Sequence, residues 1–288
     1  MKDALGDRMK SNFEDRTRFY LPRRTYTILR LDGCHFKTYT RGLKKPFDNG
    51  LSEDIDDAIL AMLPKIQGAV FAYTQSDEIS ILLTDFATPQ TDAWFDGNIQ
   101  KICSVASSIM TANFNRYRWG RYCKKLDSLS PTDLPSFLSG YAYQLPMAYF
   151  DCRTFTIPDR TEVMNYFRWR QQDCVRNSVS MVAQANFSHN ELHGKSQSDM
   201  HEMLHKKGIN WATGFTDGEK NGRIIVKESY DVSLEEVNRY LPNSEKLIGL
   251  GKDGLTHDTV QRTHWASKGA WVFTKDEGKL LQMIPDYE

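Results

Sequence analysis

The order of the apolar patterns along the sequence constrains the fold more than any other feature. Strand patterns alternate residue by residue, whereas helix patterns repeat every three to four residues. Read in this way, the chain has the order β-α-β-β-α-β, which is typical of a split βαβ (ferredoxin-like) unit. We therefore expect an α+β fold: a four-stranded antiparallel sheet with two helices on one face and the other face open to a ligand. The six patterns lie at 25–31, 53–64, 68–74, 79–84, 94–119 and 147–156, and a further helix pattern follows at 161–185.

Local signals place the ends of these elements. Ser52 precedes acidic residues and an apolar repeat, which predicts a helix that is capped by Ser52. Residues 3–19 carry spaced apolar side chains among charges and predict an opening amphipathic helix. A short polar segment joins the runs at 68–74 and 79–84, which predicts a hairpin.

The chain of 288 residues suits one catalytic domain with a C-terminal extension. We expect the catalytic domain at 1–185, including the opening helix, and a C-terminal region at 186–288 with short helices and a hairpin at 222–230 packed on it. No apolar run approaches a membrane span, and the N-terminal residues mix both signs of charge. Five cysteines in no paired spacing suit reduced thiols, so we expect a cytoplasmic location.

Net charge excludes neither nucleic-acid binding nor any other class, because 37 basic residues balance 37 acidic ones. Binding to RNA would have to come from local positive charge. Residues 116–125 interleave arginines and lysines with aromatic rings, which suits RNA contact as well as a solvated helix end. The histidine pairs 189/193 and 201/205 have zinc-ligand spacing without a third ligand, so we expect them to face solvent or RNA.

Acidic residues stand where predicted strands end. Asp32 and Gly33 follow the first strand, and Asp77 and Glu78 lie at the predicted hairpin turn. If the strands at 25–31 and 68–74 are neighbours, Asp32 and Asp77 come close enough to share magnesium, which takes one or two carboxylates plus substrate phosphates. A turn dipeptide and a solvated hairpin tip would give the same spacing. Positive charge near the first acid suits a triphosphate pocket, although it also suits a solvated face: Arg30, Lys37, Arg41, Lys44 and Lys45.

Five segments resemble the motifs of the tRNA-histidine guanylyltransferase superfamily of 3′-to-5′ RNA polymerases, and they occur in the family's order over roughly residues 5–230. They read RLDGCHF at 30–36, KKPFD at 44–48, YTQSDEIS at 73–80, FDCR at 150–153 and YFRWRQQDC at 166–174.

The resemblance implies a polymerase-palm-like fold and a nucleotidyltransferase that uses two magnesium ions, with ATP and GTP or other nucleoside triphosphates as substrates. It implies that Asp32, Asp77 and the carbonyl of Gly33 hold the ions and that Glu78 supports the site. It further implies a homotetramer. The family positions expected to contact nucleotide are Arg30, Phe36, Lys37, Lys45, Asp48, Ser76, Lys101 and Arg153.

The chain departs from the guanylyltransferase pattern after the last motif, where residues 175–180 keep one Asn of the sequence HINNLYN. Residues 176–195 resemble instead the bacterial and archaeal Thg1-like proteins. That resemblance implies template-dependent addition of nucleotides to 5′-truncated tRNA. A guanylyltransferase acting on tRNA-histidine, a nucleotide cyclase on the same scaffold and an inactive RNA-binding protein remain as alternatives.

Overall fold

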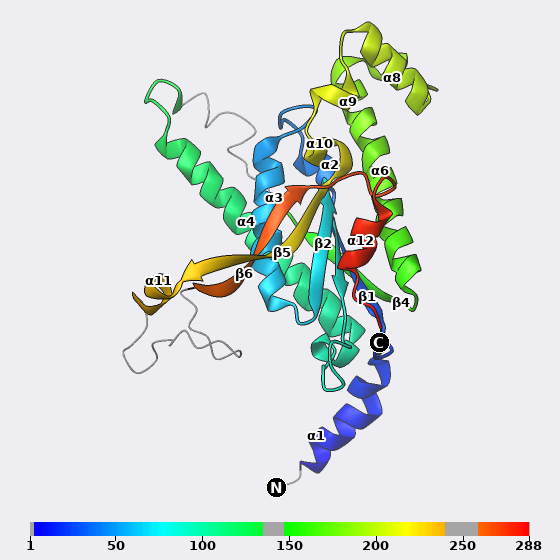
Figure 1. Cartoon of the computed structure of the whole chain (residues 1–288), viewed down its shortest axis with the longest axis vertical. Coiled ribbons are helices and arrows are strands. Elements are labelled where there is room, and N and C mark those ends of the chain that lie inside the picture. Colours follow the sequence, from blue (N-terminus) through cyan, green and yellow to red (C-terminus); the bar gives the residue numbers. More distant parts are fainter. Residues whose placement is uncertain (1–2, 135–146, 240–258, 288) are drawn as a thin grey trace. The chain divides into compact units, whose positions relative to one another are not determined.

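The computed structural model describes residues 3–134, 147–239 and 259–287 (Figure 1). The chain divides into two compact units. The first comprises residues 1–225 and 267–288, and the second comprises residues 226–266. All the residues expected at the catalytic site belong to the first unit.

A six-stranded sheet with the order β4-β1-β3-β2-β5-β6 forms the centre of the fold. The pairs β4–β1, β1–β3, β3–β2 and β2–β5 are antiparallel. The fold is therefore α+β, as expected, but with two strands more than the four predicted. The strands are β1 Tyr26–Gly33, β2 Ala69–Gln75, β3 Glu78–Leu83, β4 Phe150–Ile157, β5 Arg223–Ser233 and β6 Thr259–Gly269.

Alternation along the strands separates two kinds of face. Leu29 and Leu31 of β1 stand opposite Ile81 and Ile79 of β3, and all four side chains are fully buried. Arg30 points to the other face with its partner Ser80. The face with Leu29 and Leu31 forms part of the core, and the face with Arg30 also carries the buried Ser80.

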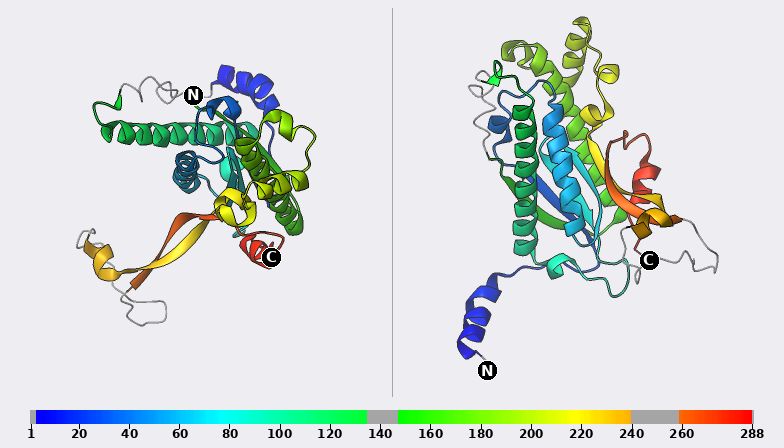
Figure 2. Two further views of the ribbon diagram at one scale, coloured as in Figure 1. Left: turned by 90° about the horizontal axis from the view of Figure 1, so that it is seen from above. Right: turned by 90° about the vertical axis from the view of Figure 1, so that its left-hand side faces the viewer.

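Long helices cover both faces, as Figure 2 shows. α3 (Asn49–Met62) and α4 (Ile99–Asp127) lie together on one face, and α6 (Arg160–Asn186) lies on the other. Phe167 of α6 packs on Phe71 of β2, with ring centroids 4.6 Å apart. The expectation of an uncovered ligand face was thus wrong for the part of the sheet beneath α6.

Three elements differ from the ranges that the apolar patterns predict. The cap of α3 is Asp48, which accepts the N–H of Leu51, so the helix begins before the predicted cap Ser52. α4 continues to Asp127, beyond the predicted helix end at residue 119, and so includes the whole segment 117–125. Residues 222–230 do not form a hairpin, because β5 is one strand and pairs with β2.

The opening segment is helical, as predicted, and buries none of its residues. The expected boundary near residue 186 coincides with the end of α6 and stays a prediction. The remaining short elements are α1 Ala4–Met9, η1 Lys10–Glu14, η2 Asp15–Thr17, α2 Phe36–Tyr39, η3 Leu63–Lys65, η4 Trp94–Gly97, α7 His189–Leu192, α8 Gln197–Lys206, α9 Trp211–Gly214, α10 Asp217–Asn221, α11 Leu234–Arg239 and α12 Glu277–Met283.

Candidate active site

Asp32 and Asp77 come together at one end of the sheet. Asp32 is the next-to-last residue of β1, and Asp77 lies in the turn that joins β2 to β3. β1 and β2 are not neighbours, although their adjacency was the condition considered for the two acids to approach, because β3 lies between them and pairs with both. The turn still brings Asp77 beside Asp32, and both line a pocket of about 400 Å³.

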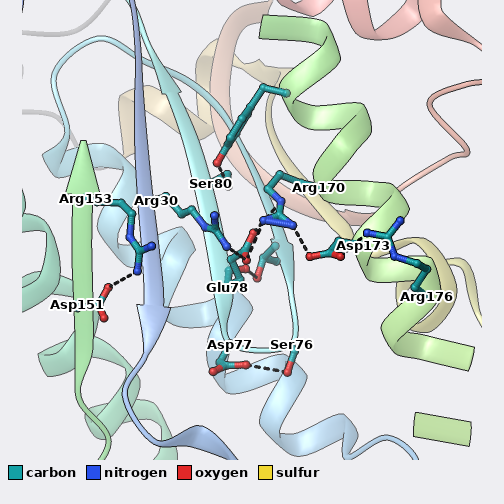
Figure 3. Close-up of polar contacts among 12 residues, drawn as sticks. Arg30, Ser76, Asp77, Glu78, Ser80, Asp151, Arg153, Arg170, Asp173 and Arg176 are labelled. Carbon is teal, nitrogen blue, oxygen red and sulfur yellow. Dashed lines mark hydrogen bonds and ion pairs between the residues drawn. The ribbon is translucent and has the colours of Figure 1, made fainter. Parts of the chain in front are cut away.

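The Asp77 carboxylate lies in an environment that disfavours its negative charge. Its burial, together with the charges of Asp32 and Glu78, raises the pKa of Asp77 to about 6. The hydroxyl of Ser76 donates a hydrogen bond of 2.9 Å to Asp77 and acts in the opposite direction (Figure 3). A cation between the two aspartates would relieve this repulsion.

Glu78 is neutralised by arginines, unlike Asp77. Its carboxylate accepts a hydrogen bond of 2.6 Å from Arg30, and Arg170 lies 3.3 Å away (Figure 3). The side chain of Arg170 is 2% exposed and also pairs with Asp173, which in turn binds Arg176. Two cations thus hold Glu78 in place, so this carboxylate is less available to a metal ion than Asp32 or Asp77.

The donor set at this end of the sheet fits magnesium. Magnesium favours carboxylate oxygens and commonly takes only one or two of them, keeping water and substrate phosphates as its other ligands. Asp32 and Asp77 supply two hard oxygen donors in one pocket. Among the described residues, no group of three or more His, Cys, Asp or Glu side chains is arranged to hold a metal ion.

Two walls of the pocket were not expected from the sequence. α6 contributes one face of polar and apolar side chains at helical spacing, and residues 218–223 contribute another. The spacing on α6 is visible in the sequence, but only the packed structure shows that this face meets the acids. The unpredicted lining side chains are Leu51, Ser52, Ile55, Gln75, Cys174, Asn177, Ser178, Ser180, Met181, Gln184, Glu219 and Arg223, together with Phe47.

The predicted nucleotide contacts divide between the pocket and its surroundings. Asp48 and Ser76 line the pocket, and Asp48 also caps α3. Arg30 lies behind the pocket on Glu78, and Arg153 stands opposite Arg30 on β4. Arg153 pairs with Asp151 and is half exposed. The exposed Lys37 and Lys45 are outside the lining.

Phe36 and Lys101 lie elsewhere. The Phe36 ring is 5% exposed and packs against Phe114 and Phe150, so the structure does not bring it to the pocket. Lys101 is near the start of α4, whereas Thr111 of the same helix binds the backbone of Phe150 beside Gly33. Ten helical residues separate the two by about 15 Å. Lys101 is therefore distant from the acids of the same chain.

The basic aromatic segment is partly structural. Arg118 and Arg121 both bind the carboxylate of Asp54, which is 1% exposed, and so join α4 to α3. Trp119 is 58% exposed and stacks on Tyr122. Of the predicted RNA-contacting residues, Trp119 is thus open to solvent, while the two arginines are largely engaged by Asp54.

Comparison with known proteins agrees with this geometry. The model of the tRNAHis guanylyltransferase family matches residues 6–158. The chain belongs to this family. Its members are nucleotidyltransferases, so the predicted family and the predicted class of enzyme are confirmed. The match covers strands β1 to β4, including the end of β1 with Asp32 and the β2–β3 turn with Asp77 and the adjoining Glu78.

Relatives and solved structures resemble the chain over most of its length. The tRNA(His) guanylyltransferase of Debaryomyces hansenii is 29% identical over 78% of this chain and 83% of its own. An uncharacterized protein of Acanthamoeba polyphaga mimivirus is 28% identical over 79% of this chain and 78% of its own. A bacterial tRNA(His) guanylyltransferase (Thg1)-like protein in complex with ATP is 36% identical over 98% of this chain and 99% of its own, with a TM-score of 0.75.

The same kind of bacterial Thg1-like protein is known in complex with GTP, at 34% identity and a TM-score of 0.70. Both nucleotides are therefore bound by structural relatives of this family member. Of the helices in the part of the chain that the structure describes, none is both long and apolar enough to span a membrane.

Proposed function

We propose that this family member adds nucleotides to the 5′ end of tRNA in the 3′-to-5′ direction, guided by the opposite strand. The observation that carries this proposal is the pair Asp32 and Asp77 in one pocket at the end of the sheet. One carboxylate at the end of a strand and one in the adjacent turn suit in-line transfer at phosphorus, for which the protein must mainly position groups and balance charge. No protein nucleophile is required.

The proposed reaction exchanges one phosphorus–oxygen bond for another. At a 5′-monophosphate end, the RNA phosphate first attacks the α-phosphorus of ATP and pyrophosphate leaves. The 3′-hydroxyl of the incoming nucleotide then loses its proton and attacks the RNA phosphorus, and AMP leaves. At a 5′-triphosphate end, pyrophosphate leaves instead. These displacements have the same in-line geometry, so one site serves them in turn.

We assign magnesium to Asp32 and Asp77, with the carbonyl of Gly33 as a further ligand predicted from the family motif. When bound, the ions supply positive charge for the attacking and leaving oxygens. Ser76 orients Asp77 through its hydrogen bond, and Glu78 stays fixed between Arg30 and Arg170. In this proposal Glu78 keeps the strand end rigid while the two aspartates meet the substrate.

The sheet supports a palm-like interpretation. Its first four strands follow the element order β-α-β-β-α-β and lie in the order β4-β1-β3-β2, which suits a ferredoxin-like unit. We propose that this unit works as a polymerase palm. The contacts of Lys37, Lys45, Lys101 and Arg153 with nucleotide, the homotetramer, the cytoplasmic location and the domain division at residue 185 remain predictions from sequence.

Guanylate addition to tRNA-histidine is the second candidate, because curated relatives such as that of Debaryomyces hansenii carry this name. Templated repair is favoured by the sequence at 175–180, which lacks the histidine of the guanylyltransferase pattern. It is also favoured by 36% identity to a bacterial Thg1-like protein.

The test is extension of a 5′-labelled tRNA that lacks its first nucleotide, with magnesium, ATP and one nucleoside triphosphate at a time. The base opposite the vacant position is varied, and tRNA-histidine with an intact 5′ end is the control substrate. Addition that follows the opposing base is expected. Guanylate addition whatever the opposing base would favour the second candidate, and turnover of nucleotide without RNA would favour a cyclase.

A further inference from the structure

Arg223, at the start of β5, is the only cation among the described residues that line the pocket, where five lining residues are acids. A nucleotide or an RNA 5′ end brings several negative charges into this space. We propose that Arg223 binds a phosphate group of the substrate there. This inference rests on the proposed function only in requiring a phosphorylated substrate in the pocket.

Two glycines place Arg223 at the pocket. Gly222 has φ of +80°, and a Cβ atom there would lie 2.5 Å from the hydroxyl oxygen of Tyr73 and 2.8 Å from the carbonyl oxygen of Thr74. The absence of a side chain lets β5 start directly beside β2, with Arg223 opposite Thr74. Gly218 leaves room for the Arg223 stem, because a Cβ there would be 3.3 Å from its Cγ.

A single acid anchors the guanidinium. The Nε–H of Arg223 points at the carboxylate of Asp56, at 2.7 and 2.9 Å from its two oxygens. Ser267 donates a hydrogen bond of 2.8 Å to the same carboxylate. Asp56 therefore holds the arginine by its inner nitrogen, with the terminal nitrogens pointing away from this anchor.

Arg223 carries further N–H donors on its two terminal nitrogens. Among the described residues, neither Nη1 nor Nη2 of Arg223 has a hydrogen-bond partner, and Nη2 is buried. Buried donors without acceptors are costly, so such a group is rare unless a ligand completes it. The planar fork of terminal N–H groups matches the oxygens of a phosphate.

The other charges of the pocket agree with a phosphate at Arg223. Glu78 is already paired with Arg30 and Arg170, and Glu219 accepts hydrogen bonds from Thr216. Glu78 and Glu219 therefore do not depend on Arg223 for an ion pair or a hydrogen bond. In this proposal a substrate phosphate binds Arg223 within the pocket that Asp32 and Asp77 also line.

Phosphates of the nucleotide and of the RNA 5′ end share this chemistry, so the experiment has an arm for each. Calorimetric titrations in magnesium buffer compare wild type with Arg223→Gln and Arg223→Lys. The ligands are ATP, adenosine, and one RNA with either a 5′-phosphate or a 5′-hydroxyl. Arg176→Gln, which removes an exposed arginine of α6, is the matched control.

Arg223→Gln is expected to weaken the binding of either ATP or the 5′-phosphorylated RNA by about tenfold or more, as for loss of a charged hydrogen bond. Its unphosphorylated counterpart should keep its affinity, and Arg223→Lys should recover part of the loss. A loss for ATP identifies the nucleotide, and a loss for 5′-phosphorylated RNA identifies the RNA end. Equal losses with and without phosphate would show a purely structural role, and no loss in either arm would also overturn the proposal.

These outcomes are independent of the proposed function. If wild type binds phosphate through Arg223 but fails to extend tRNA, the assignment of Arg223 stands and templated repair fails. If wild type extends tRNA and Arg223→Gln retains the full preference for phosphorylated ligands, templated repair stands and the assignment fails.

Discussion

Asp77 lies at a turn where its negative charge is buried beside that of Asp32, and burial with its neighbours raises its pKa to about 6. A residue that only closed a hairpin would gain nothing from this position. The arrangement is understandable if a divalent cation binds between the two carboxylates. The negative charges that repel one another would both attract the cation.

Replacing either aspartate with asparagine is expected to lower nucleotide transfer by about 10² to 10³-fold or more, since stabilisation of charge at phosphorus is lost. Single-turnover rates on the 5′-truncated tRNA measure this for Asp32→Asn and Asp77→Asn. Asp151→Asn is the control, because Asp151 stands opposite Asp32 on β4 yet is half exposed and pairs with Arg153. Normal rates in the Asp32 and Asp77 variants would refute the proposed metal site.

Arg170 links α6 to the strand end that carries Glu78. Arg170→Met should reduce the free energy of unfolding by about 3–5 kcal/mol, because it leaves the Glu78 and Asp173 carboxylates short of a buried partner. Arg176→Met should cost less than about 1 kcal/mol, because Arg176 is exposed and its ion pair among the described residues is with Asp173. Urea unfolding of both variants measures the difference, and equal stability would show that the buried pair contributes little.

At the scale of elements, the junction of α10 with β5 depends on Gly222. Gly222→Ala should destabilise the fold by about 1–3 kcal/mol from backbone strain alone, and by more from the contact with Tyr73. Gly208→Ala is the matched control, because Gly208 also has positive φ but has open space where a Cβ would lie. Thermal unfolding of the two variants separates strain from contact. A Gly222 variant no worse than the Gly208 variant would contradict the tight approach of β5 to β2.

Element boundaries show why patterns identify strands better than helix ends. β1, β2 and β3 lie within two residues of the predicted runs, because alternating apolar side chains mark them directly. The start of α3 was misplaced because Asp48 and Ser52 are both good caps, and the structure uses Asp48. The two neighbours of β5 are β2, which ends at Gln75, and β6, which begins at Thr259, and both are too distant in sequence for a local pattern to reveal.

At the scale of the whole molecule, the C-terminal segment of the first unit closes over α6. Arg160 of α6 donates to the backbone carbonyls of Leu281 and Ile284 and pairs with Asp286. Tyr26 of β1 donates to the carbonyl of Pro285. Hydrogen bonds and an ion pair thus hold the C-terminal residues against β1 and α6.

Arg160→Met is expected to lower the free energy of unfolding by about 1–3 kcal/mol, because two carbonyls lose their donors. Proteolysis near residue 281 should accelerate in the same variant. Arg168→Met is the control, because Arg168 reaches the segment only through Glu277 at 3.2 Å. Unchanged unfolding and unchanged cleavage in Arg160→Met would show that the segment is held by its apolar contacts instead.

The sequence alone determined the order of elements, the strands, the turn with Asp77 and the strand end with Asp32, because period and turn chemistry are local. Its motifs determined the family. Only the tertiary structure decided that β3 separates β1 from β2, and that α6 and Arg223 line the same pocket as the acids. These facts depend on contacts between residues far apart in the chain, such as Arg223 with Asp56 and Arg170 with Glu78, which local patterns do not encode.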